Sequence, residues 1–350
     1  MIRISILTLH FYDNFGSVLQ AWALRHFLNS QPECHAEIVP FRPRGIPNYP
    51  YFTDPELLAS FWDKQALFAA FRRDCLGMTA TDGGEEVLSA TDSDAYIVGS
   101  DIVWSREHAA LHPAYFLDFV KPGAKRIAYA ASQRLRAEDE PLAARYLPAF
   151  DAVSVREASD ASMVSRFTKV PVQTVLDPTL LLTQEDYAPL EHTDVSLPDE
   201  PYLLFYSLTH DPAAVDAANL LTKRFGLRMV HYLVDYPAAV FPNGSGCFAF
   251  CGPREFLSYV KHASLVFTNS YHGTIFSILY HRPFYTQVTR GGMSTRAIEL
   301  TGALGLENRR YGGWLDLKAA TTEQDWILPE QRLDAFRAAS RGFLLDALRV

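Results

Sequence analysis

Short apolar runs alternate with amphipathic segments along most of the chain. Residues 2–9 read IRISILTL, a nearly continuous apolar run of strand length, and residues 16–29 carry apolar side chains at helical spacing. The polar DNFG between them predicts a turn, so this pattern indicates a strand followed by a helix. The same order recurs in the first half, after the strand-like runs DAYIVGS, KRIAYAAS and DAVSVRE. Such repeated units predict a parallel sheet with crossover connections.

A second set of strand and helix patterns follows a polar, proline-bearing stretch. Pro178 in VLDPTLLL ends the first set, and residues 183–201 show no sustained periodicity, which predicts a linker. Strands are then predicted at YLLFYSL, LRMVHYLV, CFAF and SLVFTNS, and prolines open two of the helices between them. The sequence therefore predicts an α/β fold of two Rossmann-like, doubly wound domains facing a cleft. Their expected boundaries are 1–178 and 179–350, with an amphipathic C-terminal helix in the second.

Composition narrows the class of protein. A chain of 350 residues that is 48% hydrophobic and 21% charged is too apolar for disorder and too long for one ordinary core. Its formal net charge of −8 argues against a general nucleic-acid or acidic-membrane binder. Four scattered cysteines predict reduced thiols in a cytosolic protein rather than a zinc site. The first residues read as a strand rather than a signal peptide, and no apolar run reaches the roughly 18 residues of a membrane span.

Polar residues follow the first predicted strand, where parallel sheets bind ligands. Asn14 ends the turn, Gly16 permits close backbone approach, and Ser17 can cap the following helix. A helix N-terminus reached through glycine can bind an anion. Plain helix capping explains the same residues equally well, so both interpretations stay open.

Two later strand ends carry further candidates. Asp101, directly after a strand, could accept hydrogen bonds from a hydroxyl-rich ligand, and Trp104 could stack on a sugar face or belong to the core. Arg156 follows another strand and offers a planar fork for a carboxylate or phosphate. A salt bridge with Glu157 or Asp160 is the alternative for that guanidinium.

The stretch TNSYHGTIFS combines a buried-looking strand with a polar break and a helix start. Ser270 and His272 lie in the break, and the helix begins with Gly273 and Thr274. Backbone N–H groups of a first helical turn can face a ligand held by the imidazole. Histidine titrates near neutral pH, which suits a proton donor, although a lone histidine is usually structural.

Arginines bracket a short helix further along the chain. They are Arg290, Arg296, Arg309 and Arg310, and Gly291 and Gly292 suggest a tight or mobile loop beside the first of them. The arginines could close over an anion. A solvated basic face is the default interpretation of such a cluster.

Six motifs, in this order, resemble those of a known family. They are DNFGSVLQAWAL, GSDIVW, VSVRE, LDPTLLL, TNSYHGTIFSILYHRPF and STRAIELTGALGLENR. The family is the polysaccharide pyruvyl transferases, and the motifs cover the chain from about residue 10 to 310. One departure is Ile102, where many relatives carry a polar residue, often Gln. Either the acceptor or its pose differs here, or Ile102 belongs to the core.

The resemblance implies a GT-B-like fold and a reaction that uses phosphoenolpyruvate as donor. The pyruvyl carbon would pass to two hydroxyls of one sugar, giving a cyclic ketal and inorganic phosphate. In this scheme His272 is the functional histidine, which acts as general acid or donates a hydrogen bond to the phosphate. Arg156 binds the donor substrate, phosphoenolpyruvate. Arg296 fits the family pattern best as a second basic group, with Arg290 as the alternate.

The resemblance also bears on the acceptor, the cofactors and the location. Acceptor recognition is expected in the N-terminal half, mainly through Asn14, Asp101 and Trp104. The expected acceptor is a capsular, exopolysaccharide or other surface glycan on a lipid carrier, which implies a cytoplasmic enzyme, soluble or peripheral at the inner face of the membrane. No cofactor is expected, because phosphoenolpyruvate is itself activated, and a magnesium requirement stays open.

Two other functions stay open at this point. A GT-B-like fold of this size could belong to a glycosyltransferase that uses a nucleotide sugar. A member of the family could also have lost its chemistry and bind a glycan without turnover. Binding of a uridine nucleotide would favour the first, and binding without turnover, with His272 expendable, would favour the second.

Overall fold

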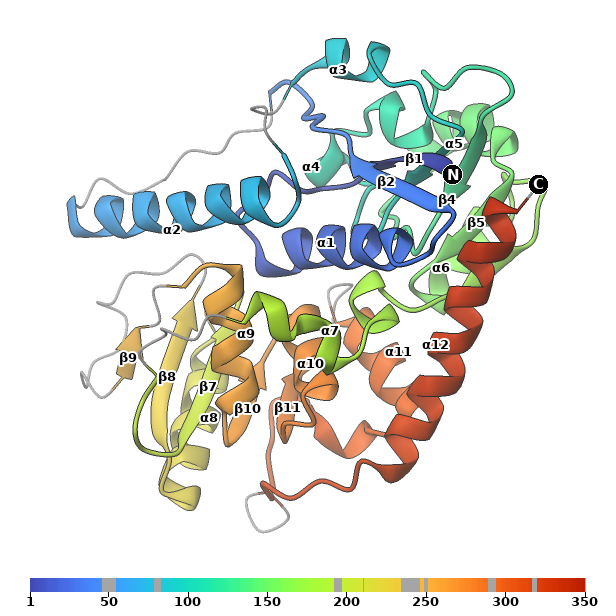
Figure 1. Cartoon of the computed structure of the whole chain (residues 1–350). Helices are drawn as coiled ribbons and strands as arrows, with labels where there is room; N and C mark the ends of the chain where they lie inside the picture. The colour runs from blue at the N-terminus through green and yellow to red at the C-terminus, as the bar shows by residue number, and fades with distance from the viewer. Residues whose placement is uncertain are drawn as a thin grey trace. The chain divides into compact units, whose positions relative to one another are not determined.

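The computed structural model describes residues 1–45, 55–78, 83–191, 197–209, 211–233, 246–248, 251–288, 294–316 and 320–349. The chain divides into two compact units. Unit 1 comprises Met1–Tyr51, Phe68–Leu182 and Ala335–Val350, and unit 2 comprises Phe52–Leu67 and Thr183–Asp334. Each unit contains a six-stranded sheet in which every described pairing is parallel, with helices packed against it (Figure 1). The predicted α/β class with two doubly wound sheets is confirmed.

The sheet of unit 1 has the order β2-β1-β3-β4-β5-β6. Its strands are β1 (Ile2–Leu7), β2 (Cys34–Ile38), β3 (Ala95–Val98), β4 (Lys125–Ala128), β5 (Ala152–Val155) and β6 (Val172–Thr174). Its helices include α1 (Phe15–Asn29), α3 (Glu85–Ser89), α4 (Arg106–Ala109), α5 (Glu140–Tyr146), α6 (Ala158–Val164) and the end of α2 (Pro55–Asp74). The chain runs outward from β1 to β2 and then returns to β3 on the other side of β1. The direction of winding therefore reverses between β1 and β3, the place where open parallel sheets bind ligands.

The sheet of unit 2 has the order β12-β11-β10-β7-β8-β9. Its strands are β7 (Tyr202–Ser207), β8 (Arg228–Leu233), β9 (Gly246–Phe248), β10 (Leu265–Thr268), β11 (Phe284–Gln287) and β12 (Arg310–Tyr311). Its helices include α7 (Gln184–Tyr187), α8 (Pro212–Phe225), α9 (Pro253–His262), α10 (Tyr271–Leu279), α11 (Thr295–Leu304) and the start of α12 (Ile327–Leu348). This is the strand order of dinucleotide-binding folds, and its winding reverses between β7 and β10.

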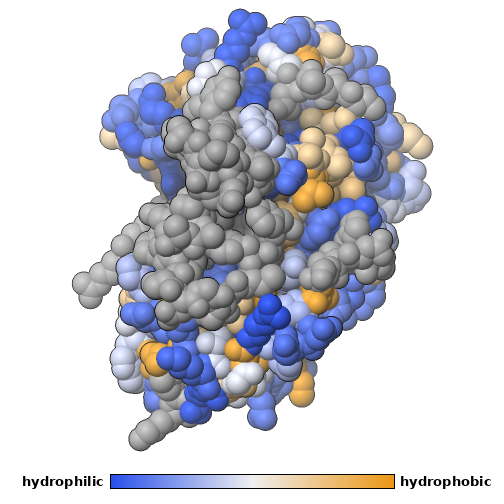
Figure 2. Space-filling view, turned by 90° about the vertical axis from the view of Figure 1, so that its left-hand side faces the viewer, coloured by the Kyte–Doolittle hydropathy of each residue, from blue (hydrophilic) through white to orange (hydrophobic). Residues whose placement is uncertain are grey.

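Both sheets are buried on their two faces, as the continuous apolar runs of their strands indicate. All four residues of β3 and all four of β10 are buried. Burying one Val, Leu, Ile or Phe side chain contributes about 1.5–3 kcal/mol, so these strands supply much of each unit's stability. On the face drawn in Figure 2, hydrophilic residues cover most of the described surface, with smaller apolar patches between them. No helix in the described part of the chain has the length and apolarity to cross a membrane.

The two units differ from the predicted boundaries of 1–178 and 179–350 in two places. Phe52–Leu67 belongs to unit 2, and the last turns of α12, the C-terminal helix, belong to unit 1. There the Ser340 hydroxyl accepts a hydrogen bond from the Leu176 amide at 2.9 Å, and Arg337 Nε donates to the Leu180 carbonyl at 2.9 Å. Sequence periodicity predicts the helix but not which sheet its buried face covers, because many partners satisfy the same pattern.

Candidate functional site

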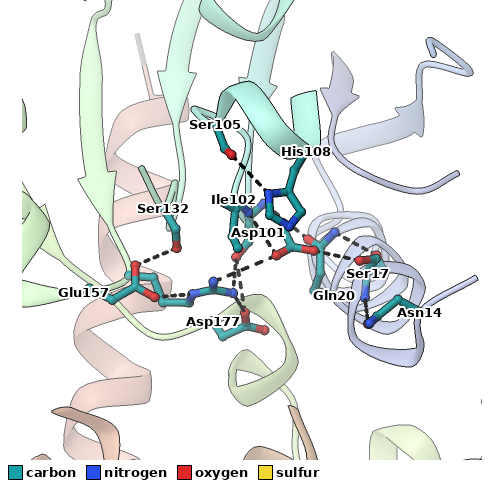
Figure 3. Close-up of polar contacts among 12 residues, drawn as sticks. Asn14, Ser17, Gln20, Asp101, Ile102, Ser105, His108, Ser132, Glu157 and Asp177 are labelled. Atoms are coloured by element: carbon teal, nitrogen blue, oxygen red, sulfur yellow. Dashed lines mark hydrogen bonds and ion pairs between the residues drawn. The ribbon is translucent and has the colours of Figure 1, made fainter. Parts of the chain in front are cut away.

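The carboxyl ends of β1 and β3 bring together four of the predicted acceptor residues in unit 1. Asp101 follows β3, and its carboxylate accepts hydrogen bonds from the Ser17 hydroxyl at 2.7 Å and the Ile102 amide at 2.9 Å (Figure 3). Asn14 is the N-cap of α1, and its side chain accepts from the Ser17 amide at 3.3 Å. Gly16 lies buried in the first turn between them. Helix capping, one of the two interpretations left open, is thus present, but the N-cap is Asn14 and not the predicted Ser17, whose hydroxyl donates to Asp101 instead.

Gln20 and Gly99 hold the ends of these two strands in place. Gln20 Nε2 donates to the Thr8 hydroxyl at 2.7 Å, and its Oε1 accepts from the Ser100 amide at 3.3 Å. Gly99 has a φ of +115°, and a Cβ there would lie 2.2 Å from the carbonyl oxygen of Tyr129. Only glycine fits this close approach, which positions the loop that carries the aspartate.

Arg156 is the centre of a buried ionic network in unit 1. Its Nη1 donates to Asp177 at 2.7 Å, its Nε donates to Glu157 at 3.0 Å, and Asp101 lies 4.0 Å from its Nη2. Asp177 also accepts hydrogen bonds from the amide and the hydroxyl of Thr179, at 3.0 and 2.6 Å. The motifs GSD, VRE and DPT therefore meet in one network, which explains their residue types without a ligand.

This geometry disagrees with the prediction that Arg156 holds the donor. Its side chain is 1% exposed and its charge faces three carboxylates. A guanidinium neutralised in this way offers little attraction to a phosphate, and removing its partners would leave buried carboxylates uncompensated. The predicted alternative, an ion pair with Glu157, is present.

The same edge of unit 1 holds further carboxyl groups. Glu157 accepts a hydrogen bond from the Ser132 hydroxyl at 2.6 Å. Asp160 accepts from the amide of Gln133 at 3.1 Å and from its side chain at 3.0 Å. Burial, and then the charge of Glu157, raise the pKa of Asp160 to about 7. The edge is therefore acidic, which disfavours an anionic ligand.

Trp104 corrects another prediction. The residue is 0% exposed, its indole N–H donates to the Tyr115 carbonyl at 2.9 Å, and its ring stacks on Phe116 with centroids 5.8 Å apart. A fully buried indole has no face on which a sugar could stack, so Trp104 belongs to the core. Ile102 is also buried, at 6% exposure.

In unit 2 the break in TNSYHGTIFS is the start of α10, at the carboxyl end of β10. Ser270 is the N-cap, and its hydroxyl accepts from the Gly273 amide at 3.3 Å. The Thr274 hydroxyl contacts the Ser270 carbonyl at 3.1 Å and the Thr286 hydroxyl at 2.8 Å. Ser270, Gly273 and Thr274 were predicted donor ligands, and the structure shows them serving the local fold. His272 lies in the first turn of the helix.

Gly273 explains why a glycine follows the histidine. A Cβ at this position would lie 2.4 Å from the Thr268 hydroxyl oxygen and 2.8 Å from Cδ1 of Tyr206. The first turn of α10 thus packs directly against the ends of β10 and β7, which a larger residue would prevent. This close packing places His272 at the winding reversal of the sheet, where a ligand is expected.

Aromatic and cationic side chains adjoin this histidine. The rings of Tyr271 and His272 meet edge to face with centroids 5.4 Å apart, and Cζ of Arg296 lies 5.8 Å from the centre of the Tyr271 ring. The structure therefore brings the predicted His272 and Arg296 together through Tyr271, which sequence reasoning did not single out. Arg290, the alternate arginine, lies outside the described residues.

Asn269 is a second residue that sequence reasoning missed. Its side-chain oxygen accepts from the Leu208 amide at 2.7 Å, and its nitrogen donates to the Thr209 hydroxyl at 2.9 Å. These bonds tie the end of β7 to the end of β10. Its position directly after a buried strand is the sequence signal that could have identified it.

The other two predicted basic groups have structural partners. Arg309 is 1% exposed and donates to the Gln324 side chain at 2.6 Å and the Thr321 carbonyl at 2.9 Å. Arg310 donates to the Thr301 hydroxyl at 2.8 Å. Within the described residues no three His, Cys, Asp or Glu side chains are grouped so that they could hold a metal ion.

Comparison with known families identifies the class of protein. The model of the polysaccharide pyruvyl transferase family matches residues 14–286 of the chain. The chain therefore belongs to the polysaccharide pyruvyl transferases. Comparison with curated protein sequences finds no significant match.

Solved structures with a similar fold include two UDP-N-acetylglucosamine 2-epimerases and a glycotransferase. A UDP-N-acetylglucosamine 2-epimerase from Rickettsia bellii has a TM-score of 0.56 at 10% identity, over 99% of this chain and 96% of that one. The UDP-GlcNAc 2-epimerase from Neisseria meningitidis, bound to UDP-GlcNAc, has a TM-score of 0.53 at 9% identity, over 98% and 94%. The glycotransferase of kitacinnamycin has a TM-score of 0.51 at 12% identity, over 99% and 97%. At these identities the likeness shows the fold, which is GT-B-like.

Proposed function

We propose that this protein transfers the pyruvyl group of phosphoenolpyruvate to two hydroxyls of one sugar, forming a cyclic ketal and releasing phosphate. The sugar would belong to a surface polysaccharide or its lipid-linked precursor. Membership of the family supports the reaction class. The observation that carries the proposal is His272 at the winding reversal of unit 2, linked through Tyr271 to Arg296.

The reaction sets clear demands on the protein. The methylene carbon of the enol phosphate gains a proton, and the central carbon becomes oxocarbenium-like and bonds to a sugar oxygen. A second sugar oxygen then replaces the phosphate on the same carbon. Of the two hydroxyl protons lost, one is balanced by the new methyl group and the other leaves with phosphate. The protein must supply an acid, a base and positive charge for the leaving group.

Unit 2 suits the donor. His272 would protonate the methylene carbon or donate to the phosphate, and α10 presents the positive end of its dipole at the same turn. Arg296 adds a permanent positive charge for a substrate that carries about three negative ones. Tyr271 supports the guanidinium through its ring.

Unit 1 suits a neutral, hydroxyl-rich acceptor. Asp101 and Ser17 form a polar pair beside the N-terminus of α1, and Asn14 begins that helix. Carboxylates accept hydrogen bonds from sugar hydroxyls but repel phosphate. Arg156 would act here as a positioning residue, since it holds Asp177 and the loop that ends β3. We expect no metal requirement, because phosphoenolpyruvate is itself activated, and phosphate release measured with and without EDTA tests this for magnesium.

The first experiment is a thermal-shift series with phosphoenolpyruvate, UDP and UDP-sugars. A ligand at about 100 times its dissociation constant should stabilise the fold by about 2.7 kcal/mol. We expect phosphoenolpyruvate to stabilise the wild type and Arg296→Ala to lose that effect. Arg228→Ala is the control. Arg228 is the first residue of β8 and pairs with Glu200, so it lies at the amino ends of the strands, away from the carboxyl ends where the donor is expected.

The outcomes separate the remaining functions. Stabilisation by UDP and not by phosphoenolpyruvate would replace the proposal with nucleotide-sugar transfer. Phosphate release in the presence of sugar acceptors should be lost in His272→Gln and kept in His281→Asn, which changes a histidine beyond the other end of α10. Binding of a glycan with no phosphate release by the wild type would instead indicate a member of the family without chemistry.

A further inference from the structure

A chain of hydrogen bonds in unit 1 ends at a histidine that the sequence motifs do not include. Ser105 is the N-cap residue of α4, and its hydroxyl donates to the carboxylate of Glu107 at 2.9 Å. The same hydroxyl oxygen lies 3.1 Å from Nδ1 of His108. Figure 3 shows the His108 ring beside the loop that carries Asp101 and opposite Ser17.

The direction of these hydrogen bonds fixes the tautomer of the histidine. A serine hydroxyl has one proton, and a carboxylate can only accept. The hydroxyl of Ser105 therefore donates its proton to Glu107 in a charge-assisted hydrogen bond. The pKa of Glu107 is lowered, first by the hydrogen bond from its own amide and second by this bond from Ser105. The Ser105 oxygen must then accept from His108. Nδ1 therefore carries a hydrogen, which makes Nε2 the basic nitrogen of the ring in its neutral form.

Tyr12 ties this histidine to the acceptor residues. Its hydroxyl donates to the backbone carbonyl of His108 at 2.9 Å, and the two rings meet with centroids 6.5 Å apart. The pKa of Tyr12 is raised, first by burial and second by the negative charge of Asp101, so the two side chains interact electrostatically. Glu107 is held from the other side by Arg136 at 2.5 Å. His108 is thus fixed at both its ring and its backbone.

We propose that His108 is the base that accepts a proton from an acceptor hydroxyl in this reaction, with Ser105 and Glu107 as positioning residues. The inference rests on the proposed function, which leaves the base unassigned. Nε2 takes the hydroxyl proton as the sugar oxygen bonds to the central carbon of the pyruvyl group. The imidazolium that forms is stabilised through Ser105 by the Glu107 carboxylate, and it returns its proton to the departing phosphate. The proton of the second hydroxyl replaces the one that the acid gave to the methylene carbon, so the protons balance.

Asp101 is the competing choice for the base, and its contacts argue against it. Both of its oxygens already accept hydrogen bonds, from Ser17 and from the Ile102 amide, and Arg156 lies 4.0 Å away. Each of these contacts stabilises the carboxylate and makes it a weaker base. Imidazole is the side chain best matched to proton transfer near neutral pH.

The tautomer can be measured without any substrate. Long-range 15N–1H NMR on protein labelled at histidine, at about pH 8, distinguishes the two ring nitrogens, and His108→Gln identifies the signal. We expect hydrogen on Nδ1 in the wild type and a shift toward the other tautomer in Ser105→Ala. Hydrogen on Nε2 in the wild type would overturn the relay, whatever the outcome for the proposed function.

The catalytic role is tested by phosphate release with phosphoenolpyruvate and methyl glycosides of glucose, galactose and mannose. His108→Gln should lower turnover by about 10²–10⁴-fold while the thermal shift with phosphoenolpyruvate is kept. Glu107→Gln should give a smaller loss, and since Glu107 is exposed this variant tests the relay in a protein that still folds. His35→Ala, an exposed histidine on β2, is the control.

Two results would overturn this role. One is wild-type turnover by His108→Gln. The other is loss of the phosphoenolpyruvate shift in that variant, which would make His108 a donor ligand. If no wild-type turnover occurs and phosphoenolpyruvate does not bind, the proposed function fails and the base role fails with it, whereas the tautomer result stands.

Discussion

The carboxyl edges of the two sheets use arginine in opposite ways. In unit 1 Arg156 is 1% exposed and lies among Asp101, Glu157 and Asp177. In unit 2 Arg296 is partly exposed and lies over the ring of Tyr271. The first guanidinium is surrounded by compensating charge, whereas the second lies over Tyr271, whose ring also contacts His272. Position at a strand end therefore does not tell what an arginine does; its neighbours do.

This difference gives each edge its own preference for ligands. Three carboxylates around one guanidinium leave the edge of unit 1 acidic, which suits sugar hydroxyls. The edge of unit 2 combines a helix N-terminus, His272 and Arg296, which suits an anion. The proposed allocation of acceptor to unit 1 and donor to unit 2 agrees with this difference in charge.

The largest expected effect comes from removing the two arginines in turn. Arg156→Ala should cost about 3–5 kcal/mol of unfolding free energy, because it leaves buried carboxylates without a partner. Arg296→Ala should change stability by less than about 1 kcal/mol, since a partly exposed cation over an aromatic ring contributes little. Urea unfolding, followed by circular dichroism, measures both values.

Arg156→Lys is the matched control for this comparison. It keeps the charge but loses the planar fork that reaches Asp177 and Glu157 together, so an intermediate loss of stability is expected. Equal stability of Arg156→Ala and the wild type would contradict the buried network. Loss of phosphoenolpyruvate binding in a fully folded Arg156→Ala would restore the donor role that the sequence suggested.

Much of the fold follows from local pattern. The strand at residues 2–7, the helix opened by Pro212 and the helix start after Ser270 all carry their signals within a few residues. Apolar runs, proline at a first turn and an N-cap serine act through nearest neighbours, so one sequence suffices to predict them. The predicted doubly wound topology implies a reversal of winding, and His272 lies at this place, where open parallel sheets generally bind ligands.

What sequence could not predict depends on distant partners. Asp177 stands 21 positions from Arg156, and only the folded sheet brings the two side chains within 2.7 Å. Trp104 looks the same in sequence whether it stacks on a sugar or fills a core. His108 is a candidate base because of its contacts with Ser105, which is close in sequence, and Tyr12, which is distant. Contacts of this kind require the three-dimensional fold.

A second prediction contrasts the pH dependence that each unit contributes. Asp160 of unit 1 has a pKa raised from 3.8 to about 7, so the folded chain binds its proton more tightly than the unfolded chain. Its contribution to stability is full below pH 4 and is lost as pH rises toward 7. His231 of unit 2 has a pKa lowered from 6.5 to about 4 by burial, which gives the opposite slope between these values.

Unfolding free energies from pH 4 to 8 test this contrast. The difference between wild type and Asp160→Asn should fall as pH rises, by at most about 1.4 kcal/mol per pH unit for one proton. Asparagine can still accept the hydrogen bond from Gln133, so the fold is retained. A difference that does not vary with pH would mean that Asp160 is ionised throughout and that the edge of unit 1 is more acidic still.

The smallest expected effect compares the two helix N-caps at the winding reversals. The side chains of Asn14 and Ser270 each accept a backbone amide at 3.3 Å, in α1 and α10. Asn14→Ala and Ser270→Ala should each cost about 1 kcal/mol, whereas Asn14→Ser and Ser270→Asn, which keep a capping oxygen, should cost a few tenths. Thermal unfolding of the four variants measures this.

If Asn14 also contacts the acceptor, Asn14→Ser should keep its stability and yet raise the KM for the sugar. Ser270→Asn should leave that KM unchanged. Capping and acceptor binding, which the sequence could not separate, thereby become separate measurements, and an unchanged KM in Asn14→Ser would leave capping as the function of that residue.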